Sequence, residues 1–389
     1  MKTLGIISEF NPFHNGHKYL LDKAKKDLNT DVNISIMSGD FVQRGEASIM
    51  DKFTRAQTAI DAGFDLVVEI PSFVSLQAAE FFAFKSVSIL DKMNVDYLVF
   101  GIENIDSINF INQSRIIIEN QNEIDNKIKN LLKDGLSYPK AYNISLLDFV
   151  DKDFISSNNV LALEYIRAIK KLNSKIEPYP IKRIKSLNKD QFINDENFAS
   201  STAIRNNLFS DINKLMPSFS YENLMEFQKK FNSINENDLY AYFRYKVLIE
   251  KSPMTKILGY EVGIDNFLAR LAEANISYDS FLNQATSQRY TRSRIKRLVL
   301  NYLLSNTTEL NGIDISFIKV LAYKKRAIDL FKDFSNKLDI IISKKNISKL
   351  NEENLLIYNK MVEASNLYSL CINRDFNIDF THNNRPIGW

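Results

Sequence analysis

The stretch TLGIISEFNPFHNGH, residues 3–17, decides the fold. Its first six residues form an apolar run with the length of a buried strand, and Pro12 with the Asn15-Gly16 pair marks a tight turn behind it. Residues 15–28 then place apolar side chains three or four positions apart, which is typical of an amphipathic helix. The stretch therefore predicts a strand that runs through a tight turn into a helix.

Short apolar runs and helical segments keep alternating as far as about residue 215. This alternation is typical of βαβ units and predicts an α/β protein with a parallel, Rossmann-like sheet, whose ligands bind at the carboxyl ends of the strands. The predicted strands are 3–8, 32–37, 65–70, 96–100 and 176–184, and the predicted helices are 15–28, 52–62, 76–90, 106–133, 138–149, 160–169 and 200–208.

Beyond Met216-Pro217 the alternation stops. The rest of the chain has mainly helical spacing, with one possible strand at 338–343. Because 389 residues exceed what one hydrophobic core usually supports, we expect two domains, an α/β domain over residues 1–215 and a mainly α-helical domain over residues 216–389.

Composition excludes several classes of protein. The lone Cys371 excludes an intrachain disulfide framework and a thiolate metal site, which favours a reducing cytoplasm. The start MKTLGIISEF lacks the pattern of a signal peptide, and no run approaches the roughly 20 apolar residues of a membrane span. We expect a soluble, cytoplasmic protein that makes no membrane contact. The net charge of +3 is informative only where it is locally concentrated.

Two of the three histidines, His14 and His17, lie three residues apart directly after the first strand. The turn places both imidazoles at the carboxyl edge of the sheet, beside a helix N-terminus that favours anionic oxygens. They suit the charge that develops on a transferring phosphoryl group, so His14 and His17 are the candidate catalytic residues. Metal ligation and an ordinary turn are the alternatives. No cysteine and no obvious carboxylate pair supports ligation, and no metal site is predicted.

Other positions suggest phosphate or nucleotide contacts. Gly101 follows a strand, where a missing side chain would let a nucleotide approach the backbone, although a strand-end turn also explains it. Ser200-Ser201-Thr202 offers hydroxyls and free N–H groups at a helix start, as a plain cap, a phosphate seat or both. Arg183 and Arg205 are candidates to neutralise phosphate, against the alternative of solvated side chains.

Two polar segments carry further candidates. The loop 38–55 has the polar density of a lid or recognition loop, in which Arg44 or Lys52 would hold a carboxylate or pyrophosphate. The segment 289–297 concentrates the positive charge on one arc of a helix, which suits contact with a nucleic-acid backbone. A solvated surface is the alternative for both. The basic candidates are Arg289, Arg292, Arg294, Lys296 and Arg297.

Residues 5–20 resemble the His-x-Gly-His signature of the nucleotidyltransferase superfamily, and EFNPFHNGH with MSGDFVQRGEAS resembles one family within it, the bacterial tRNA(Met) cytidine acetate ligases. The resemblance weakens in the C-terminal half, where it centres on SQRYTRSRIKR (287–297). Ala47 and Ser157 stand where the family often has proline, a departure that concerns loop rigidity. In the N-terminal half the matching blocks keep the family's order: DLVVEIP (65–71), Ala79-Glu80, FGIEN (100–104), NNVLALEY (158–165), Lys182-Arg183 and ASSTAIR (199–205).

The resemblance implies an ATP-dependent ligase with an N-terminal nucleotidyltransferase domain and a C-terminal tRNA-binding domain. Acetate would be activated as acetyl-adenylate, with Mg²⁺ on the phosphates, and pyrophosphate would be released. The acetyl group would then pass to the exocyclic amine of the wobble cytidine of elongator tRNA(Met), forming N4-acetylcytidine. The basic segment 289–297 would contact that tRNA.

Carried over position by position, the resemblance implies an ATP site in which Asn158 is preferred over Asn159. Its residues are Ile7, Ser8, Glu9, Phe10, Asn11, Pro12, Phe13, His14, Asn15, Gly16, His17, Lys18, Tyr19, Leu20, Gly101, Asn158, Asn159 and Arg183. The phosphate candidates at the helix start, Ser201, Thr202 and Arg205, complete the expected ATP site.

Two other functions stay open on the sequence. A small-molecule nucleotidyltransferase would need the same histidine turn but no RNA-binding domain, and a non-catalytic RNA-binding protein would not need the histidines. No residue stands out as a base for acetyl transfer, and none is needed if the tRNA alone positions the amine. The tRNA identity determinants, the oligomeric state and any lid motion are likewise open.

Overall fold

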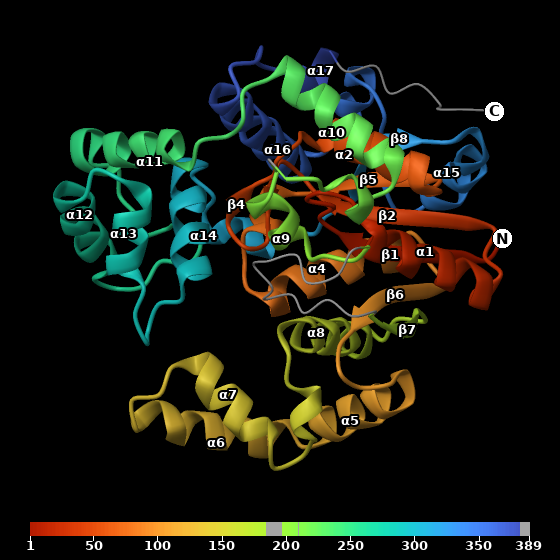
Figure 1. Ribbon diagram of the computed structural model, residues 1–389, viewed down its shortest axis with the longest axis horizontal. Helices are drawn as coiled ribbons and strands as arrows, with labels where there is room; N and C mark the ends of the chain where they lie inside the picture. Colours follow the sequence, from red (N-terminus) through yellow and green to blue (C-terminus); the bar gives the residue numbers. More distant parts are fainter. Residues whose placement is uncertain (184–196, 209, 382–389) are drawn as a thin grey trace.

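A seven-stranded sheet forms the centre of the computed structural model, which describes residues 1–183, 197–208 and 210–381 (Figure 1). The strand order is β7-β6-β1-β2-β5-β8-β9, and neighbouring strands are parallel except for the antiparallel pair β5–β8. The strands are β1 (Thr3–Ser8), β2 (Val32–Ser38), β5 (Leu66–Ile70), β6 (Tyr97–Ile102), β7 (Glu177–Lys182), β8 (Phe317–Tyr323) and β9 (Asp339–Ile341), and a separate hairpin consists of β3 (Phe41–Val42) and β4 (Glu46–Ala47).

Helices cover both faces of the sheet (Figure 1). Helices α1 and α2 pack in one apolar core, and α4 and α8 pack in the other. The helices are α1 (Asn15–Leu28), α2 (Lys52–Ala62), α3 (Ser72–Ser75), α4 (Ala79–Lys92), α5 (Ser107–Glu119), α6 (Gln121–Lys133), α7 (Tyr138–Leu146), α8 (Ser157–Lys171), α9 (Ser201–Asn206), α10 (Ser218–Lys230), α11 (Glu236–Arg244), α12 (Ile264–Ala274), α13 (Tyr278–Ala285), α14 (Arg292–Leu303), α15 (Ile328–Phe334), α16 (Glu352–Cys371) and α17 (Ile378–Thr381).

Strand β1 lies inside the sheet, between β6 and β2, because its side chains fit both cores. Leu4 and Ile6 are buried in the core that contains α1. On the opposite face, a Cβ at Gly5 would lie 3.0 Å from Leu90 Cδ2 and 3.1 Å from Val95 Cγ1, so glycine lets the α4 side approach closely. The histidine turn that follows β1 is therefore carried by a strand that is packed on both faces.

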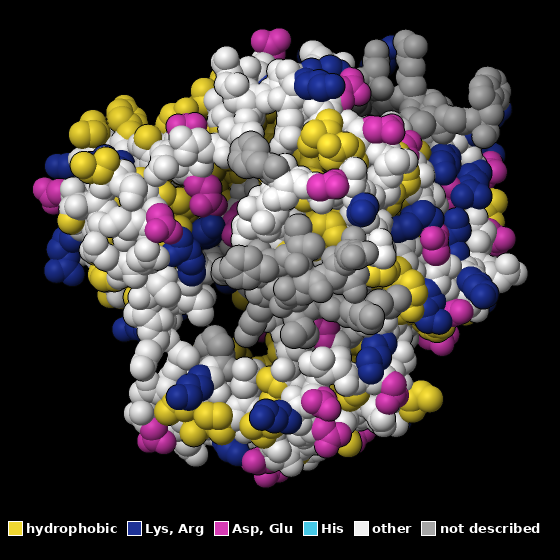
Figure 2. All heavy atoms as spheres, in the orientation of Figure 1, with side chains coloured by type: hydrophobic (Ala, Val, Ile, Leu, Met, Phe, Trp, Pro, Cys, Tyr) yellow, Lys and Arg dark blue, Asp and Glu magenta, His cyan; other side chains and the backbone are white. Residues whose placement is uncertain are grey.

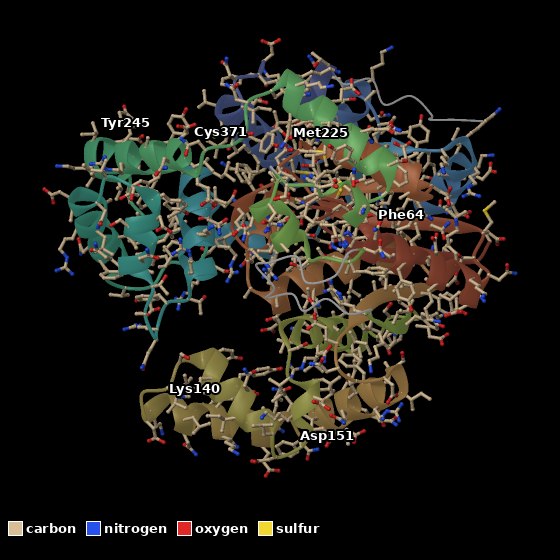
Figure 3. All side chains as sticks on the ribbon, viewed as in Figure 1. Phe64, Lys140, Asp151, Met225, Tyr245 and Cys371 are labelled. Carbon is tan, nitrogen blue, oxygen red and sulfur yellow. The ribbon has the colours of Figure 1, made fainter. Side chains whose placement is uncertain are left out.

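Two helical groups stand away from the sheet (Figure 1). Helices α5 to α7 form a layer beyond α8, and α11 to α14 form a lobe with an apolar core of its own. Figure 3 places Tyr245 on this lobe, well away from Phe64 beside the sheet, and Lys140 and Asp151 on the α5–α7 layer. None of the helices within the described ranges is long and apolar enough to cross a membrane.

The predicted parallel sheet and helical C-terminal lobe are confirmed, and the possible strand at 338–343 is present as β9. The predicted strand 176–184 is β7, and its last position, 184, lies outside the described residues. The single helix predicted at 106–133 is wrong, since the chain breaks at Asn120 between α5 and α6.

Strand β8 was not predicted, and it joins the C-terminal half of the chain to the sheet of the N-terminal half. Its residues, FIKVLAY, are buried throughout and pair with β5, so the sheet takes its last two strands from beyond residue 215. A boundary near 215 marks where the strand–helix alternation stops along the chain, but it does not separate the sheet from the C-terminal half.

Candidate active site

The turn after β1 positions the two histidines through backbone hydrogen bonds. His14 is the N-cap of α1, and its Nδ1 accepts the N–H of Gly16 at 3.0 Å. His17 Nδ1 accepts the N–H of His14 at 3.2 Å, which completes a capping box made of two imidazoles. The rings stack with centroids 3.8 Å apart. The His-x-Gly-His spacing therefore also closes the start of the helix.

Both imidazoles are neutral at neutral pH. Burial, reinforced by Arg183, lowers the pKa of His17 to about 3. Burial also holds the pKa of His14 well below its ordinary value, with His17 and Arg183 acting in the same direction. Since each Nδ1 accepts a backbone N–H, the proton of each neutral ring lies on Nε2. The pair consequently offers two Nε2–H donors, and positive charge has to come from other residues.

Four arginines supply that charge around one cavity of about 870 Å³ at the carboxyl ends of β1, β6 and β7. Burial lowers the pKa of three of them, Arg183, Arg205 and Arg297, the last to about 10, and all three remain cationic at neutral pH. Arg44 on the β3–β4 hairpin also lines the cavity. A cavity with neutral imidazole donors and partly buried guanidinium groups is suited to a polyphosphate.

Arg205 joins three parts of the site. Its Nη1 donates to the carbonyl of Asn11 in the histidine turn at 2.8 Å, and its Nη2 lies 3.2 Å from Glu46 Oε2 on the hairpin. Ser201 and Thr202, at the start of the same short helix α9, line the cavity. The Ser-Thr-Arg cluster predicted from sequence is thus brought against the histidines, although Ser200 itself serves as the N-cap by accepting from Ala203.

Arg183 and Gly101 act together at the other side of the cavity. A Cβ at position 101 would lie 3.1 Å from Arg183 Cγ, so glycine leaves room for the arginine stem to lie on the strand end. Arg183 Nη1 lies 3.6 Å from Glu103, which also accepts a hydrogen bond from Asn158 Nδ2 at 2.6 Å. Gly101 therefore has a packing role that the sequence did not suggest.

Most of the predicted ATP-site residues line this cavity. They are Ile7, Ser8, Glu9, Phe10, His14, Gly16, His17, Tyr19, Leu20, Gly101, Asn158, Arg183, Ser201, Thr202 and Arg205, together with Arg44 from the loop.

Five of the predicted ATP-site residues between positions 7 and 20 do not line the cavity, and Asn11 and Asn15 among them hold the turn in place. Asn11 Oδ1 accepts the N–H of Ile49 at 2.9 Å, and the Asn15 side chain donates to the carbonyls of Asn197 and Lys214. The other three residues outside the lining are Pro12, Phe13 and Lys18.

Two predicted site residues lie elsewhere. Asn159 is fully buried, and its amide bonds the backbone of Glu103 and Phe154, so Asn158 is the asparagine that faces the cavity. Lys52 is also fully buried and lies 2.9 Å from Glu69 and 2.7 Å from Asp379, which removes it from substrate contact. The loop pattern could not reveal this, because Asp379 is far away in sequence.

The basic segment does not form one exposed ridge. Lys296 is buried between Glu46 at 3.1 Å and Glu236 at 2.9 Å, and Arg297 lines the cavity. Arg289, Arg292 and Arg294 are more exposed but pair with Glu261 or Asp279. On the face seen in Figure 2, acidic and basic side chains are interspersed over the α11–α14 lobe.

Sequence reasoning missed the apolar wall of the cavity, which includes Phe82, Phe100 and Tyr165. A signal for Tyr165 was available, because Asn158, Ala162 and Tyr165 follow one another at helical spacing on one face of α8. Among the described residues no group of three or more His, Cys, Asp or Glu side chains is arranged to hold a metal ion.

A strand–turn–helix with paired imidazoles at the edge of a parallel sheet defines a nucleotidyltransferase of the His-x-Gly-His class. The family model described as HIGH Nucleotidyl Transferase matches residues 1–383. The chain is 33% identical to a tRNA(Met) cytidine acetate ligase of Fusobacterium nucleatum over 95% of both chains. It is 34% identical to one of Clostridium botulinum over 98% of this chain and 97% of that one. The chain belongs to the tRNA(Met) cytidine acetate ligase family.

Solved structures agree with this assignment. A crystal structure of Thermotoga maritima TmcAL without ligand matches with a TM-score of 0.85 and 31% identity over 95% of each chain. A second crystal form of that protein, bound with alpha-thio ATP, matches with a TM-score of 0.87 and 30% identity over 99% of each chain. The chain thus has the fold of these structures over nearly its whole length, and it belongs to the same class of ATP-dependent ligases.

Proposed function

We propose that this chain joins acetate to ATP and transfers the acetyl group to the wobble cytidine of elongator tRNA(Met). The observation that carries the proposal is the stacked His14–His17 pair, because both histidines line one cavity together with four arginines. Family membership and the nucleotide-bound relative support the choice of ATP.

In the first step, an acetate oxygen attacks the α-phosphorus of ATP and pyrophosphate leaves. His14 and His17 donate hydrogen bonds to phosphate oxygens, which gain charge in the transition state. Arg183 and Arg205 offset the negative charge of the triphosphate, and Arg44, which also lines the cavity, attracts the acetate carboxylate. Since these groups are held in advance by backbone and ion-pair contacts, positioning provides much of the rate.

Mg²⁺ fits this site as an ion coordinated by the triphosphate rather than by a cluster of protein side chains. The cavity carboxylate of Glu46 is already paired with Arg205 and Lys296, and the described residues hold no ready-made metal cluster. Mg²⁺ usually keeps phosphate and water ligands in such sites, where it neutralises phosphate charge.

The tRNA is proposed to approach from the α14 side. Arg297 and Ser293 of α14 line the cavity, so an RNA bound along this helix lies at the mouth of the site. Arg289, Arg292 and Arg294 would exchange their carboxylate partners for phosphates of the RNA backbone. The sites of the tRNA-binding residues, the elongator identity of the tRNA and a cytoplasmic location stay predictions.

The test is incubation of the purified protein with ATP, labelled acetate and tRNA, followed by nucleoside analysis. Labelled N4-acetylcytidine that depends on ATP is the expected product. Unlabelled tRNA, with a dinucleotide formed from ATP and a mononucleotide, would instead identify a small-molecule nucleotidyltransferase.

A further inference from the structure

Glu9 is the first residue after β1, and its position is fixed from two sides. Its Oε1 accepts the N–H of Gln43 at 2.9 Å, and its carbonyl accepts a hydrogen bond from Arg55 at 2.6 Å. Arg55 is fully buried and also donates to the carbonyls of Ser38 and Met50 at 3.1 Å. Arg55 of α2 therefore fixes the backbone of Glu9, and the β3–β4 hairpin fixes its carboxyl group.

The carboxyl of Glu9 faces the cavity with one oxygen uncommitted. Across the described ranges its only hydrogen bond is the one from Gln43, and no ion pair holds it. The other carboxylate at the cavity, Glu46, has each oxygen paired with a cation, Lys296 or Arg205. Glu9 thus has a free acceptor where Glu46 has none.

The charge of Glu9 does not suit direct contact with the acetate carboxylate or with the phosphates of ATP. An ionised carboxylate repels both acetate and the triphosphate, and the cavity already has arginines for them. The titratable groups that face Glu9 are Arg44 and Glu46 on the hairpin, Arg205 on α9 and Tyr165 on α8. Burial raises the pKa of Glu9 against the opposing effect of Gln43 and the arginines. A carboxylate with a raised pKa is a stronger base than one in water.

Glu9 also lies on the path from the proposed tRNA-binding helix to the nucleotide. The N–H of Gln43 holds Glu9, and the carbonyl of the same residue accepts a hydrogen bond from Arg297 of α14 at 3.2 Å. Gly45, two residues further along the hairpin, has φ 78 and packs so closely on α14 that a Cβ would lie 2.6 Å from the Arg297 backbone nitrogen. The hairpin therefore links the helix proposed to meet RNA with the free carboxylate.

We propose that Glu9 accepts the proton of the cytidine amine during acetyl transfer. The amine nitrogen forms a bond to the acetyl carbonyl carbon, and the bond from that carbon to the AMP oxygen breaks. The electron pair leaves with AMP, and the amine proton goes to the uncommitted oxygen of Glu9. The amine of cytosine is conjugated with its ring and is a poor nucleophile, so removal of its proton assists the attack. This inference rests on the proposed ligase function.

Glu9→Gln tests the role while it preserves the acceptor for Gln43. Because Glu9 lines the ATP cavity, acetate-dependent exchange of labelled pyrophosphate into ATP, which reports only the first step, should also fall, but by at least about tenfold less than the transfer step. Single-turnover transfer from synthetic acetyl-adenylate to tRNA(Met) should fall by about 100-fold or more, the usual contribution of a general base. A transfer rate within about threefold of wild type, or an equal loss in both steps, overturns the proposal.

The pH profile of the transfer step separates a base from a structural residue. The wild-type rate should rise with pH through the raised pKa of Glu9, and the Glu9→Gln rate should lack this acidic limb. Glu9→Asp should transfer the acetyl group more slowly but keep the acidic limb of the pH profile. Glu46→Gln should lower the transfer rate and also keep the acidic limb. A flat Glu9→Asp profile overturns the role. Wild type that forms no acetylcytidine refutes the ligase function itself, and the role of Glu9 with it.

Discussion

The turn at residues 9–17 and the basic segment at 289–297 both look functional in the sequence. In the structure, however, different kinds of contact hold their side chains. In the turn, the two histidines are fixed by neighbours in the same short segment, as His17 is by the N–H of His14. In the basic segment, the position of each cation is set by contacts with residues that are distant in sequence, as that of Lys296 is by its ion pair with Glu46. The difference teaches that a local hydrogen-bonded motif predicts its own geometry, whereas a run of charge does not predict what it faces.

The largest expected effect is at the turn. His17→Ala removes one Nε2–H donor and should lower acetate-dependent pyrophosphate release by about 100- to 1000-fold, the range for loss of one transition-state donor. The thermal unfolding curve should show that the fold remains. Release within about tenfold of wild type would mean that the histidine only caps the helix, and the contrast with the basic segment would disappear.

A smaller effect is expected at Arg205, which belongs to neither region but donates a hydrogen bond to the turn at Asn11. Arg205→Ala should weaken ATP binding by about 10- to 100-fold, because a charge-assisted hydrogen bond contributes about 1.5–3 kcal/mol. Calorimetric titration with ATP at fixed salt measures this effect. Arg115→Ala, which removes an exposed arginine on α5, is the matched control and should bind ATP as wild type does.

The depressed pKa of His17 predicts a pH dependence of stability. The folded imidazole has a pKa of about 3, whereas the unfolded one titrates near its ordinary value of 6.5, so the unfolded chain binds more protons between these values. The contribution of His17 to the free energy of unfolding is therefore fully present above about pH 6.5 and is lost progressively as the pH falls below that value. From about pH 7.5 to about pH 5, wild type should lose about 2 kcal/mol more than His17→Gln in urea unfolding. Equal losses in both proteins would show that the ring is not buried in its neutral form.

The smallest effect is expected at the exposed arginines of the basic segment. The double variant Arg289→Gln, Arg292→Gln should weaken tRNA binding a few-fold and reduce the salt slope by about two, while pyrophosphate exchange is unchanged. Filter binding over a range of salt concentrations tests both values. An unchanged slope would leave this surface without RNA contacts. Lys296 is unsuitable for this test, since its substitution also breaks buried ion pairs.

Sequence predicted the strands around the site well, because short buried strands of a parallel sheet are apolar throughout. It failed at β8, where Lys319 interrupts the apolar run. That lysine is buried against Glu69 and Asp379, and only the folded chain brings these carboxylates to it. A residue that looks like a sign of solvent exposure thus belongs to the central sheet.

By itself, the sequence determined the strand, the turn and the helix that carry His14 and His17, because their geometry depends on backbone contacts within a few residues. Tertiary structure decided which of the other polar groups face the nucleotide. It directed Asn158 into the cavity and Asn159 away from it, and it enclosed Lys52 beside Asp379. The physical reason is range: a hydrogen bond in a turn joins near neighbours, whereas the partner of a buried charge is selected only when distant segments pack together.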